Sequence, residues 1–127
     1  MEGLKLLLVE DNILNQKLIY LNLNKFGFEI DVANNGVEGL AKAKDNRYDL
    51  ILMDLMMPLM DGLEATQEIR LYEKSTNYHT PIIGLTANTF DADREKSLAV
   101  GMDEFMAKPF DVDVFLAILK ILEIQKV

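Results

Sequence analysis

The stretch Leu50–Gly62 reads LILMDLMMPLMDG and decides how the rest of the chain can fold. Its first four residues are apolar, and a run that short and that apolar is typical of a strand buried on both faces. The run ends on Asp54, a carboxylate that is costly inside an apolar core unless it is paired. Pro58 stops the strand, and Asp61 with Gly62 supplies turn residues. Asp54 is therefore expected at the exit of the strand, where a solvated strand-end Asp is the simplest explanation of it alone.

Four further short apolar runs predict strands, at Leu4–Val9, Phe28–Ala33, Pro81–Thr86 and Glu104–Ala107. Helices are expected between and after them, over residues 12–27, 37–46, 62–73, 91–100 and 111–122, with a loop at 88–91. Asp11 or Asn12 could cap the first helix, and Asp111 is expected to cap the last. Because strand and helix alternate throughout, the sequence favours the α/β class, with a five-stranded parallel doubly wound sheet and helices on both faces.

Apolar residues at helical spacing mark the face that each helix is expected to turn toward the sheet. These are Leu14, Leu18 and Leu21 in the first helix, Val37, Leu40, Ala41 and Lys44 in the second, Ala65, Ile69 and Tyr72 in the third, and Phe115, Ile118, Leu119 and Leu122 in the last. The helix at 91–100 is weakly amphipathic and ends at Gly101, so it is expected to be the most loosely held.

Composition narrows the function classes. The 127 residues suit one domain, residues 1–127. The absence of cysteine excludes disulfides and thiolate metal sites. The net charge of −8, from 13 basic and 21 acidic residues, argues against direct nucleic-acid binding and permits a cation site. No apolar run approaches the roughly 20 residues of a membrane helix, and no signal peptide is recognisable. We therefore expect a cytoplasmic protein without membrane contact.

Polar side chains follow four of the five predicted strands. They are Glu10 with Asp11, Asp54, Thr86 and Lys108, whereas the strand that ends at Ala33 has no such residue and suits an edge position. In a parallel sheet the carboxyl ends of the strands meet at one edge, which is where such folds bind their ligands. Each residue alone has an ordinary explanation, such as a helix cap, a satisfied hydroxyl or a solvated lysine. Their joint position predicts a single site.

The chemistry of that site follows from the residue types. Three carboxylates, Glu10, Asp11 and Asp54, repel one another and call for a cation. All-oxygen ligands without His or Cys suit Mg²⁺, which keeps several waters and can accept phosphate oxygens. Lys108 can neutralise a phosphoryl group and Thr86 can donate a hydrogen bond to it. Together they predict phosphoryl transfer, with Asp54 as the acceptor that forms an aspartyl phosphate.

At this point the chain resembles a known family, the receiver domains of two-component response regulators. The resemblance is carried, in this order along the chain, by Val9-Glu10-Asp11-Asn12, Met53-Asp54, Met57-Pro58-Leu59-Met60-Asp61-Gly62, Leu85-Thr86-Ala87 and Lys108-Pro109. Each piece is weak alone, and the set at this spacing is highly specific. It implies the flavodoxin-like sheet order 2-1-3-4-5, in which the switch point lies between the first and third strands. The Val-Glu-Asp-Asn form, followed by Asn15-Gln16, is most similar to receivers of hybrid sensor histidine kinases.

The resemblance also implies roles for single residues. Asp54 would be the phosphoacceptor, and Thr86 and Lys108 would hold the phosphoryl oxygens. Asp11, Asp54 and the main-chain carbonyl of Met56 would bind Mg²⁺ directly, with Glu10 acting through water. Thr86 and Phe105 would form the switch pair, although Phe105 on a short strand is also an ordinary core residue. The Lys108-Pro109 peptide occupies a position that is cis in the family.

The implied protein is a signalling switch and not an enzyme in the usual sense, with Mg²⁺-dependent self-phosphotransfer and autodephosphorylation. Its donor would be a histidine kinase or a histidine phosphotransfer protein. A downstream partner would bind the face formed by the fourth helix, the fifth strand and the last helix. Three departures concern Glu10, where Asp is commoner, Phe105, which lacks a hydroxyl, and Met56, where a polar residue is frequent. The last puts the rate of dephosphorylation in doubt.

Three alternatives fit the sequence less well. A magnesium phosphatase with an Asp nucleophile usually has a second carboxylate close behind it, whereas Met56 and Pro58 follow Asp54. A degenerate receiver that only docks would have lost some of the site residues, and all are present. A flavin-binding relative would need a Ser, Thr or Gly-rich phosphate loop after the first strand, where Glu10 and Asp11 would repel phosphate. His79, the only histidine, lies in a polar connector and is expected to be exposed.

Overall fold

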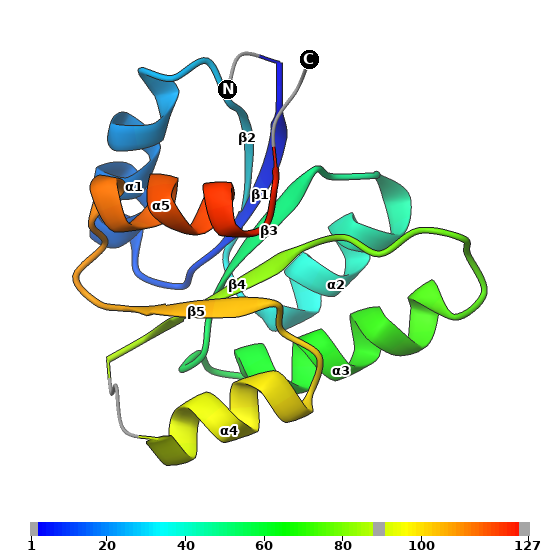
Figure 1. Cartoon of the computed structure of the whole chain (residues 1–127). Helices are drawn as coiled ribbons and strands as arrows, with labels where there is room; N and C mark the ends of the chain where they lie inside the picture. Colours follow the sequence, from blue (N-terminus) through cyan, green and yellow to red (C-terminus); the bar gives the residue numbers. More distant parts are fainter. Residues whose placement is uncertain (1–2, 88–90, 125–127) are drawn as a thin grey trace.

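The computed structural model describes residues 3–87 and 91–124, and strands and helices alternate along them (Figure 1). The strands are β1 (Lys5–Val9), β2 (Glu29–Ala33), β3 (Leu50–Asp54), β4 (Ile82–Thr86) and β5 (Glu104–Ala107). The helices are α1 (Ile13–Asn24), α2 (Gly36–Asp45), α3 (Gly62–Glu73), α4 (Asp91–Ala99) and α5 (Val112–Ile121). The predicted elements are thus confirmed, with ends that differ by a few residues. Residues 88–90 of the predicted loop lie outside the described residues.

The strands form one parallel sheet in the order β2-β1-β3-β4-β5. The predicted fold class and strand order are therefore confirmed. β3 lies in the centre, and all five of its residues are buried. Its last residue, Asp54, is opposite Leu85 of β4 in the register, while Met53 is opposite Val9 of β1. The polar residues that follow β1, β3, β4 and β5 consequently meet at one edge of the sheet.

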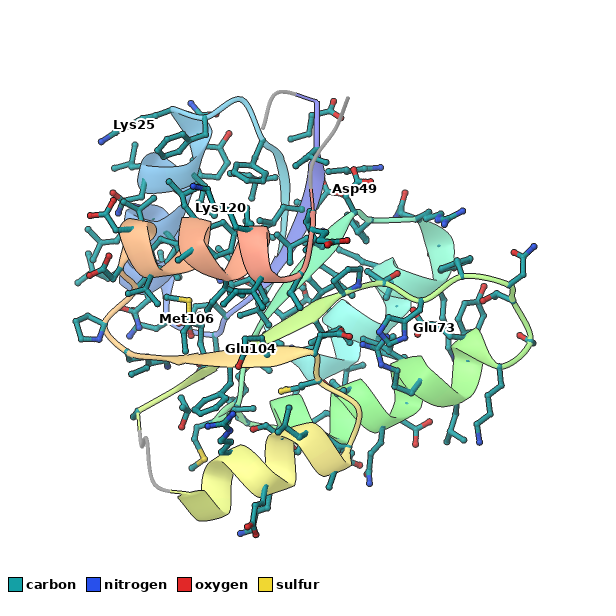
Figure 2. The ribbon with its side chains drawn as sticks, viewed as in Figure 1. Lys25, Asp49, Glu73, Glu104, Met106 and Lys120 are labelled. Atoms are coloured by element: carbon teal, nitrogen blue, oxygen red, sulfur yellow. The ribbon has the colours of Figure 1, made fainter. Side chains whose placement is uncertain are left out.

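Helices cover both faces of the sheet, as Figure 1 shows, with α1 and α5 on one face and α2 and α3 on the other. Alternate side chains of β1 serve the two faces: Leu6 and Leu8 pack with α1 and α5, whereas Leu7 and Val9 pack with α2 and α3. Met106 points from β5 toward α5 (Figure 2) and belongs to the first of these cores. Both faces of the central strands are dry, which accounts for their continuous apolar sequence.

The predicted inner face of α1 is wrong. Leu14, Leu18 and Leu21 have exposed fractions of 66%, 52% and 63%, whereas Ile19 and Leu23 are buried. The helix carries apolar side chains on both faces, so spacing alone did not distinguish the buried face from the exposed one. The outer leucines of α1 are left as an apolar surface that the fold itself does not use.

Most of the predicted inner face of α2 is also wrong, because only Leu40 of its four residues packs against the core. Val37 is 50% exposed and both Ala41 and Lys44 are exposed, while the buried positions are Gly36, Gly39 and Ala43. Small residues make this contact because the helix lies very close to its neighbours. A Cβ on Gly39 would lie 2.9 Å from a methyl group of Val9. The apolar pattern pointed to larger side chains than the space allows.

The predicted apolar faces of α3 and α5 agree with the structure. Ala65 and Ile69 of α3 are buried, as are Phe115, Ile118 and Leu119 of α5. Asp111 caps α5 by accepting hydrogen bonds from the amides of Asp113 and Val114, and Gly101 follows α4 with a φ of 106°. None of the described helices is long and apolar enough to span a bilayer.

Candidate functional site

Three carboxylates gather at the carboxyl edge of the sheet. Glu10 and Asp11 directly follow β1, and Asp54 ends β3. One oxygen from each side chain lies within 4.8 Å of the other two. The predicted convergence of these residues is therefore confirmed, and it results from two adjacent parallel strands that end at the same level.

Two of the carboxylates are buried, which leaves oxygens without hydrogen bonds. Glu10 and Asp54 have exposed fractions of 0% and 1%, whereas Asp11 is exposed. Among the described residues, Glu10 Oε1 and Asp54 Oδ2 are buried and accept no hydrogen bond. An unpaired buried carboxylate oxygen is costly, so a group that supplies positive charge is favoured here. Clustered oxygens without nitrogen or sulfur ligands fit a hard cation such as Mg²⁺.

Lys108 supplies the positive charge that the protein itself brings to this edge. Its Nζ lies 2.9 Å from Asp54 Oδ1 and 3.8 Å from Glu10 Oε1. Burial would lower the pKa of Lys108, but the carboxylates of Asp54, Glu10 and Asp11 outweigh it and raise that pKa above its usual value. The Lys108-Pro109 peptide bond is cis, as the resemblance implied. Lys108 therefore stays protonated and paired with Asp54.

One lysine does not neutralise the cluster. Burial first, and the adjacent Asp54 carboxylate second, raise the pKa of Glu10 from 4.5 to about 7, although Lys108 and the amide of Asn12 act in the opposite direction. That amide donates to Glu10 Oε2 at 3.3 Å. Ionised Glu10 is thus disfavoured next to ionised Asp54 in the protein without a bound cation.

The loop after β3 folds back over Asp54. The amide of Met56 donates to Asp54 Oδ1 at 3.3 Å, and the amide of Gly62 donates to the carbonyl of Leu55. A Cβ at Gly62 would collide with the carbonyl oxygen of Asp54, so this approach requires glycine. The loop therefore places the Met56 backbone beside the carboxylate. The use of its carbonyl as a metal ligand stays a prediction.

Thr86 and Phe105 occupy the positions expected of them. Thr86 ends β4, is buried, and its carbonyl accepts a hydrogen bond from the amide of Lys108 at 2.7 Å. Phe105 is partly buried on β5, with the guanidinium carbon of Arg94 5.8 Å from its ring centroid. Arg94 belongs to α4, so this contact links α4 to β5. The switch roles of both residues stay predictions.

One polar contact at this edge was not predicted from the sequence. Gln16 Nε2 donates to the main-chain carbonyl of Glu10 at 2.5 Å and to Asn34 Oδ1 at 2.8 Å. In the sequence, Gln16 stands out only as part of the Asn15-Gln16 motif. Its place in the first turn of the helix that follows β1 was the available signal, because side chains of that turn lie beside the strand end.

His79, expected to be exposed, is 57% exposed and its Nε2 lies 2.7 Å from Asp103 Oδ1.

Comparison with known proteins agrees with this geometry. The sequence model of the response regulator receiver domain matches residues 6–120. The chain is 44% identical over 126 residues to hybrid signal transduction histidine kinase B of Dictyostelium discoideum, which covers 91% of this chain and 6% of that kinase. It is 38% identical to histidine kinase 5 of Arabidopsis thaliana, over 83% of this chain and 14% of that kinase. The chain thus spans only a small part of these curated relatives.

Solved structures give the same answer. The receiver domain of a sensor histidine kinase from Pseudomonas aeruginosa, crystallised with a magnesium ion coordinated in its active-site cleft, is 41% identical and superposes with a TM-score of 0.84, covering 94% of this chain and 96% of that one. The family match spans most of the chain, and the relatives exceed 30% identity over most of it. The chain therefore belongs to the response regulator receiver domain family of two-component signalling, and it is most similar to the receivers of hybrid histidine kinases.

Proposed function

We propose that this chain acts as one receiver domain, residues 1–127, that accepts a phosphoryl group from a phosphohistidine donor onto Asp54. The observation that carries the proposal is a buried carboxylate at the end of the central strand, 2.9 Å from Lys108 and beside two further carboxylates. The domain then relays the phosphoryl group or switches a partner. Its partners are a histidine kinase or a histidine phosphotransfer protein, and the exchange takes place in the cytoplasm.

The transfer needs no general base to deprotonate Asp54, because the attacking group is a carboxylate. A carboxylate oxygen of Asp54 attacks phosphorus, an O–P bond forms, and the N–P bond of phosphohistidine breaks as the imidazole leaves with the electron pair and takes up a proton. Lys108 Nζ, which already contacts Asp54 Oδ1, is placed to pair with a phosphoryl oxygen. Thr86 is the proposed hydroxyl donor to a second oxygen. Positioning and charge, rather than covalent chemistry by other side chains, provide the catalysis.

Mg²⁺ is the cofactor of the proposed reaction. Asp11, Asp54 and the Met56 carbonyl would hold it directly, and Glu10 would act through water. The buried oxygens of Glu10 and Asp54 that accept no hydrogen bond support this ligand set. When bound, the ion neutralises negative charge that builds up on the phosphoryl oxygens and the carboxylates. A neighbouring structure, the receiver domain of an Arabidopsis thaliana histidine kinase, is complexed with Mg²⁺ and BeF₃⁻ and is 28% identical with a TM-score of 0.88.

The phosphoryl group should be lost slowly. Dephosphorylation is the attack of a water molecule on the aspartyl phosphate, and it is faster when a polar side chain orients that water. Met56, two residues after Asp54, is 75% exposed and has no group that hydrogen-bonds strongly to water. A long-lived phosphoryl group suits a domain that relays it to another histidine.

The donor would contact an apolar rim around the carboxyl edge. This rim consists of exposed side chains from α1 and from the loop after β3, namely Ile13, Leu14, Leu18, Met56 and Leu59. A cavity of about 500 Å³ shares Leu18 with this rim and is also lined by Glu10, Lys108 and Phe110. The output would leave on the other side, on the face of α4, β5 and α5, where Arg94 contacts Phe105.

The test is transfer from a histidine phosphotransfer protein that carries a radiolabelled phosphoryl group. The label should move to this chain in the presence of Mg²⁺ and should be released by hydroxylamine, as an acyl phosphate is. With Asp54→Asn, or with EDTA, no label should move. Equal labelling of the parent and of Asp54→Asn would overturn the proposal.

A further inference from the structure

We propose that Gln16 is a positioning residue for the metal site: it fixes the peptide between Glu10 and Asp11, and so aims the Asp11 carboxylate at Mg²⁺. The inference rests on the proposed function. Gln16 lies on α1, and its side chain donates hydrogen bonds to Glu10 and Asn34 rather than to Asp54. Its effect would reach the ion only through the backbone after β1.

Gln16 is the middle of a chain of hydrogen bonds across the edge of the sheet. Its Nε2 group donates to the carbonyl of Glu10 at 2.5 Å and to Asn34 Oδ1 at 2.8 Å. Asn34, which follows β2, donates from Nδ2 to Glu38 Oε1 at 3.2 Å, and its main-chain amide donates to the same oxygen at 3.3 Å. Asn35 donates to the other oxygen, Glu38 Oε2, at 3.4 Å. This chain of hydrogen bonds thus connects α2, β2, α1 and the end of β1.

The direction of this chain is fixed by its two ends, because both can only accept hydrogen bonds. The Glu38 carboxylate requires the NH₂ group of Asn34, which turns the Asn34 oxygen toward Gln16. The Glu10 carbonyl likewise requires the NH₂ group of Gln16. Only one orientation of each amide satisfies every contact, so the chain cannot reverse without losing hydrogen bonds at both ends.

The consequence for Asp11 follows from the planarity of the peptide bond. The Glu10 amide donates to the carbonyl of Ala33 at 3.0 Å, and the Glu10 carbonyl is held by Gln16. Both polar groups of the Glu10 backbone are therefore fixed. The carbonyl of Glu10 and the amide of Asp11 share one planar group, so holding the first also orients the second. Glu10 is further held by burial, whereas the exposed Asp11 side chain depends on its backbone for direction.

This arrangement gives the edge strand a part in the site. The end of β2 carries no residue of the carboxylate cluster, and the sequence predicts no role for it. Asn34 nevertheless connects that end to Glu10 through Gln16. Groups that orient metal ligands from behind typically change metal affinity by about 10-fold or more when they are removed.

The experiment is a titration of the metal-free ¹⁵N-labelled protein with MgCl₂, followed by amide chemical shifts. Gln16→Ala should weaken Mg²⁺ binding by about 10-fold. Gln16→Glu keeps the shape of the side chain and removes its donors. It should weaken Mg²⁺ binding at least as much as Gln16→Ala does, because it places an acceptor opposite the two acceptors, Glu10 O and Asn34 Oδ1. Asn34→Ala should weaken Mg²⁺ binding less than Gln16→Ala does. In the double variant, the loss of binding free energy should be smaller than the sum of the two single losses, because both residues act through the same chain of hydrogen bonds.

Asn22→Ala is the matched control. Asn22 also lies on α1, and its Nδ2 donates to the main-chain carbonyl of Leu18 at 2.9 Å. Asn22→Ala removes an amide-to-carbonyl hydrogen bond of the same kind but leaves the Glu10 peptide unchanged. The Mg²⁺ affinity of this variant should therefore equal that of the parent. The thermal midpoint of each metal-free variant reports its stability separately.

The outcomes separate the two proposals. Weak binding by Gln16→Ala with parental binding by Asn22→Ala supports the positioning role. Parental binding by both Gln16→Ala and Gln16→Glu overturns it and leaves the proposed function intact. If the parent itself shows no shifts with MgCl₂ around Asp11 and Asp54, the proposed metal site is wrong, and the positioning role falls with it.

Discussion

Glu10 and Asp54 show at the scale of single residues what this site costs the protein. Both carboxylates are buried, they lie close together, and Lys108 is the cation that pairs with them among the described residues. Buried charges are costly when they lie close to like charges or lack a partner, because the surroundings cannot solvate them. The site therefore exchanges stability of the metal-free fold for affinity toward a cation.

Glu10→Gln should remove a pH dependence of stability. The pKa of Glu10 is about 7 in the folded protein and 4.5 in the reference state, so the folded state binds the proton more tightly. This contribution to stability is complete below pH 4.5 and is lost as the pH rises through 7. Denaturant unfolding of the metal-free parent should show a fall of about 2 kcal/mol in the free energy of unfolding between pH 5 and pH 8, relative to Glu10→Gln.

Glu68→Gln serves as the control for this measurement, because Glu68 is an exposed carboxylate on α3. It should leave the pH profile of the parent unchanged. Saturating Mg²⁺ should raise stability most at pH 8, since cation ligands must be deprotonated. The same pH profile in the parent and in Glu10→Gln would show that Glu10 ionises in the folded protein as easily as in the unfolded chain.

At the scale of the element, α2 depends on a glycine that spacing did not reveal. Gly39→Ala would normally favour a helix by about 1 kcal/mol. Here the new Cβ would lie 2.9 Å and 3.0 Å from the two methyl groups of Val9, whose branched side chain has little freedom. We expect thermal or urea unfolding to show a net loss of about 1–3 kcal/mol, as for other overpacked cores.

The double variant Gly39→Ala with Val9→Ala tests the cause. Removing the two methyl groups makes room for the new Cβ, so the second substitution should cost less in the Gly39→Ala background than in the parent. If the costs of the two substitutions simply add, the contact between α2 and β1 is not the source of the loss.

Arg70 of α3 links chain segments at the edge of the sheet opposite the carboxylate cluster. Its guanidinium contacts Glu73 at 2.6 Å and Asp103 at 2.9 Å, and it donates to the carbonyls of Thr80 and Gly101 at 2.8 Å. Figure 2 shows Glu73 on α3 beside the chain that leads into β4. Arg70→Met would leave Glu73 buried without its cation, so the free energy of unfolding should fall by about 3 kcal/mol.

Lys74→Met is the matched control, because Lys74 directly follows α3 and is exposed. It should change the free energy of unfolding by no more than about 0.5 kcal/mol. Hydrogen exchange should also quicken at Ile82 in Arg70→Met, since the Ile82 amide donates to Asp103 Oδ2, which Arg70 holds. Equal losses in the two variants would contradict the role assigned to Arg70.

The sequence predicted the strands better than the helix faces, and the reason is physical. Strands such as β3 are buried on both sides, so their apolar runs stand out in the sequence. In α1 the exposed face is as apolar as the buried one, and in α2 glycine replaces the expected large side chains. Surface leucines and close helix contacts both break the simple link between apolar spacing and burial.

At the scale of the whole molecule, the gathering of Glu10, Asp54 and Lys108 was predictable because parallel strands end at one edge. The contact of Gln16 with the Glu10 carbonyl was not, since it depends on the rotation of α1 about its axis. A polar residue in a helix has many possible partners in three dimensions. Strand order alone determines where a strand-end carboxylate lies.

Thr86→Ala should separate phosphoryl acceptance from signal output. With Mg²⁺ and beryllofluoride, the parent should show amide shifts from Asp91 to Gly101, in and just after α4, and at Phe105 on β5. In Thr86→Ala the mimic should still bind. The shifts should be lost, because the variant has no hydroxyl that could move toward the mimic and donate a hydrogen bond to it. Heteronuclear NMR spectra with and without the mimic provide the measurement, and a coupling of about 1–3 kcal/mol suffices for the shift.

Thr76→Ala is the control, because the Thr76 hydroxyl donates to the carbonyl of Glu73 at the end of α3, away from the site. It should respond to beryllofluoride as the parent does. Equal shifts in the parent and Thr86→Ala, or shifts confined to the loop at residues 56–62, would show that the signal leaves the site by another route.

The central claim is that Asp54 carries the phosphoryl group, and intact mass spectrometry tests it most directly. After incubation with acetyl phosphate and Mg²⁺, the parent should gain the mass of one phosphoryl group, and hydroxylamine should remove it. Asp54→Ala should gain nothing under the same conditions. An adduct of full yield in Asp54→Ala, or one in the parent that survives hydroxylamine, would contradict the account.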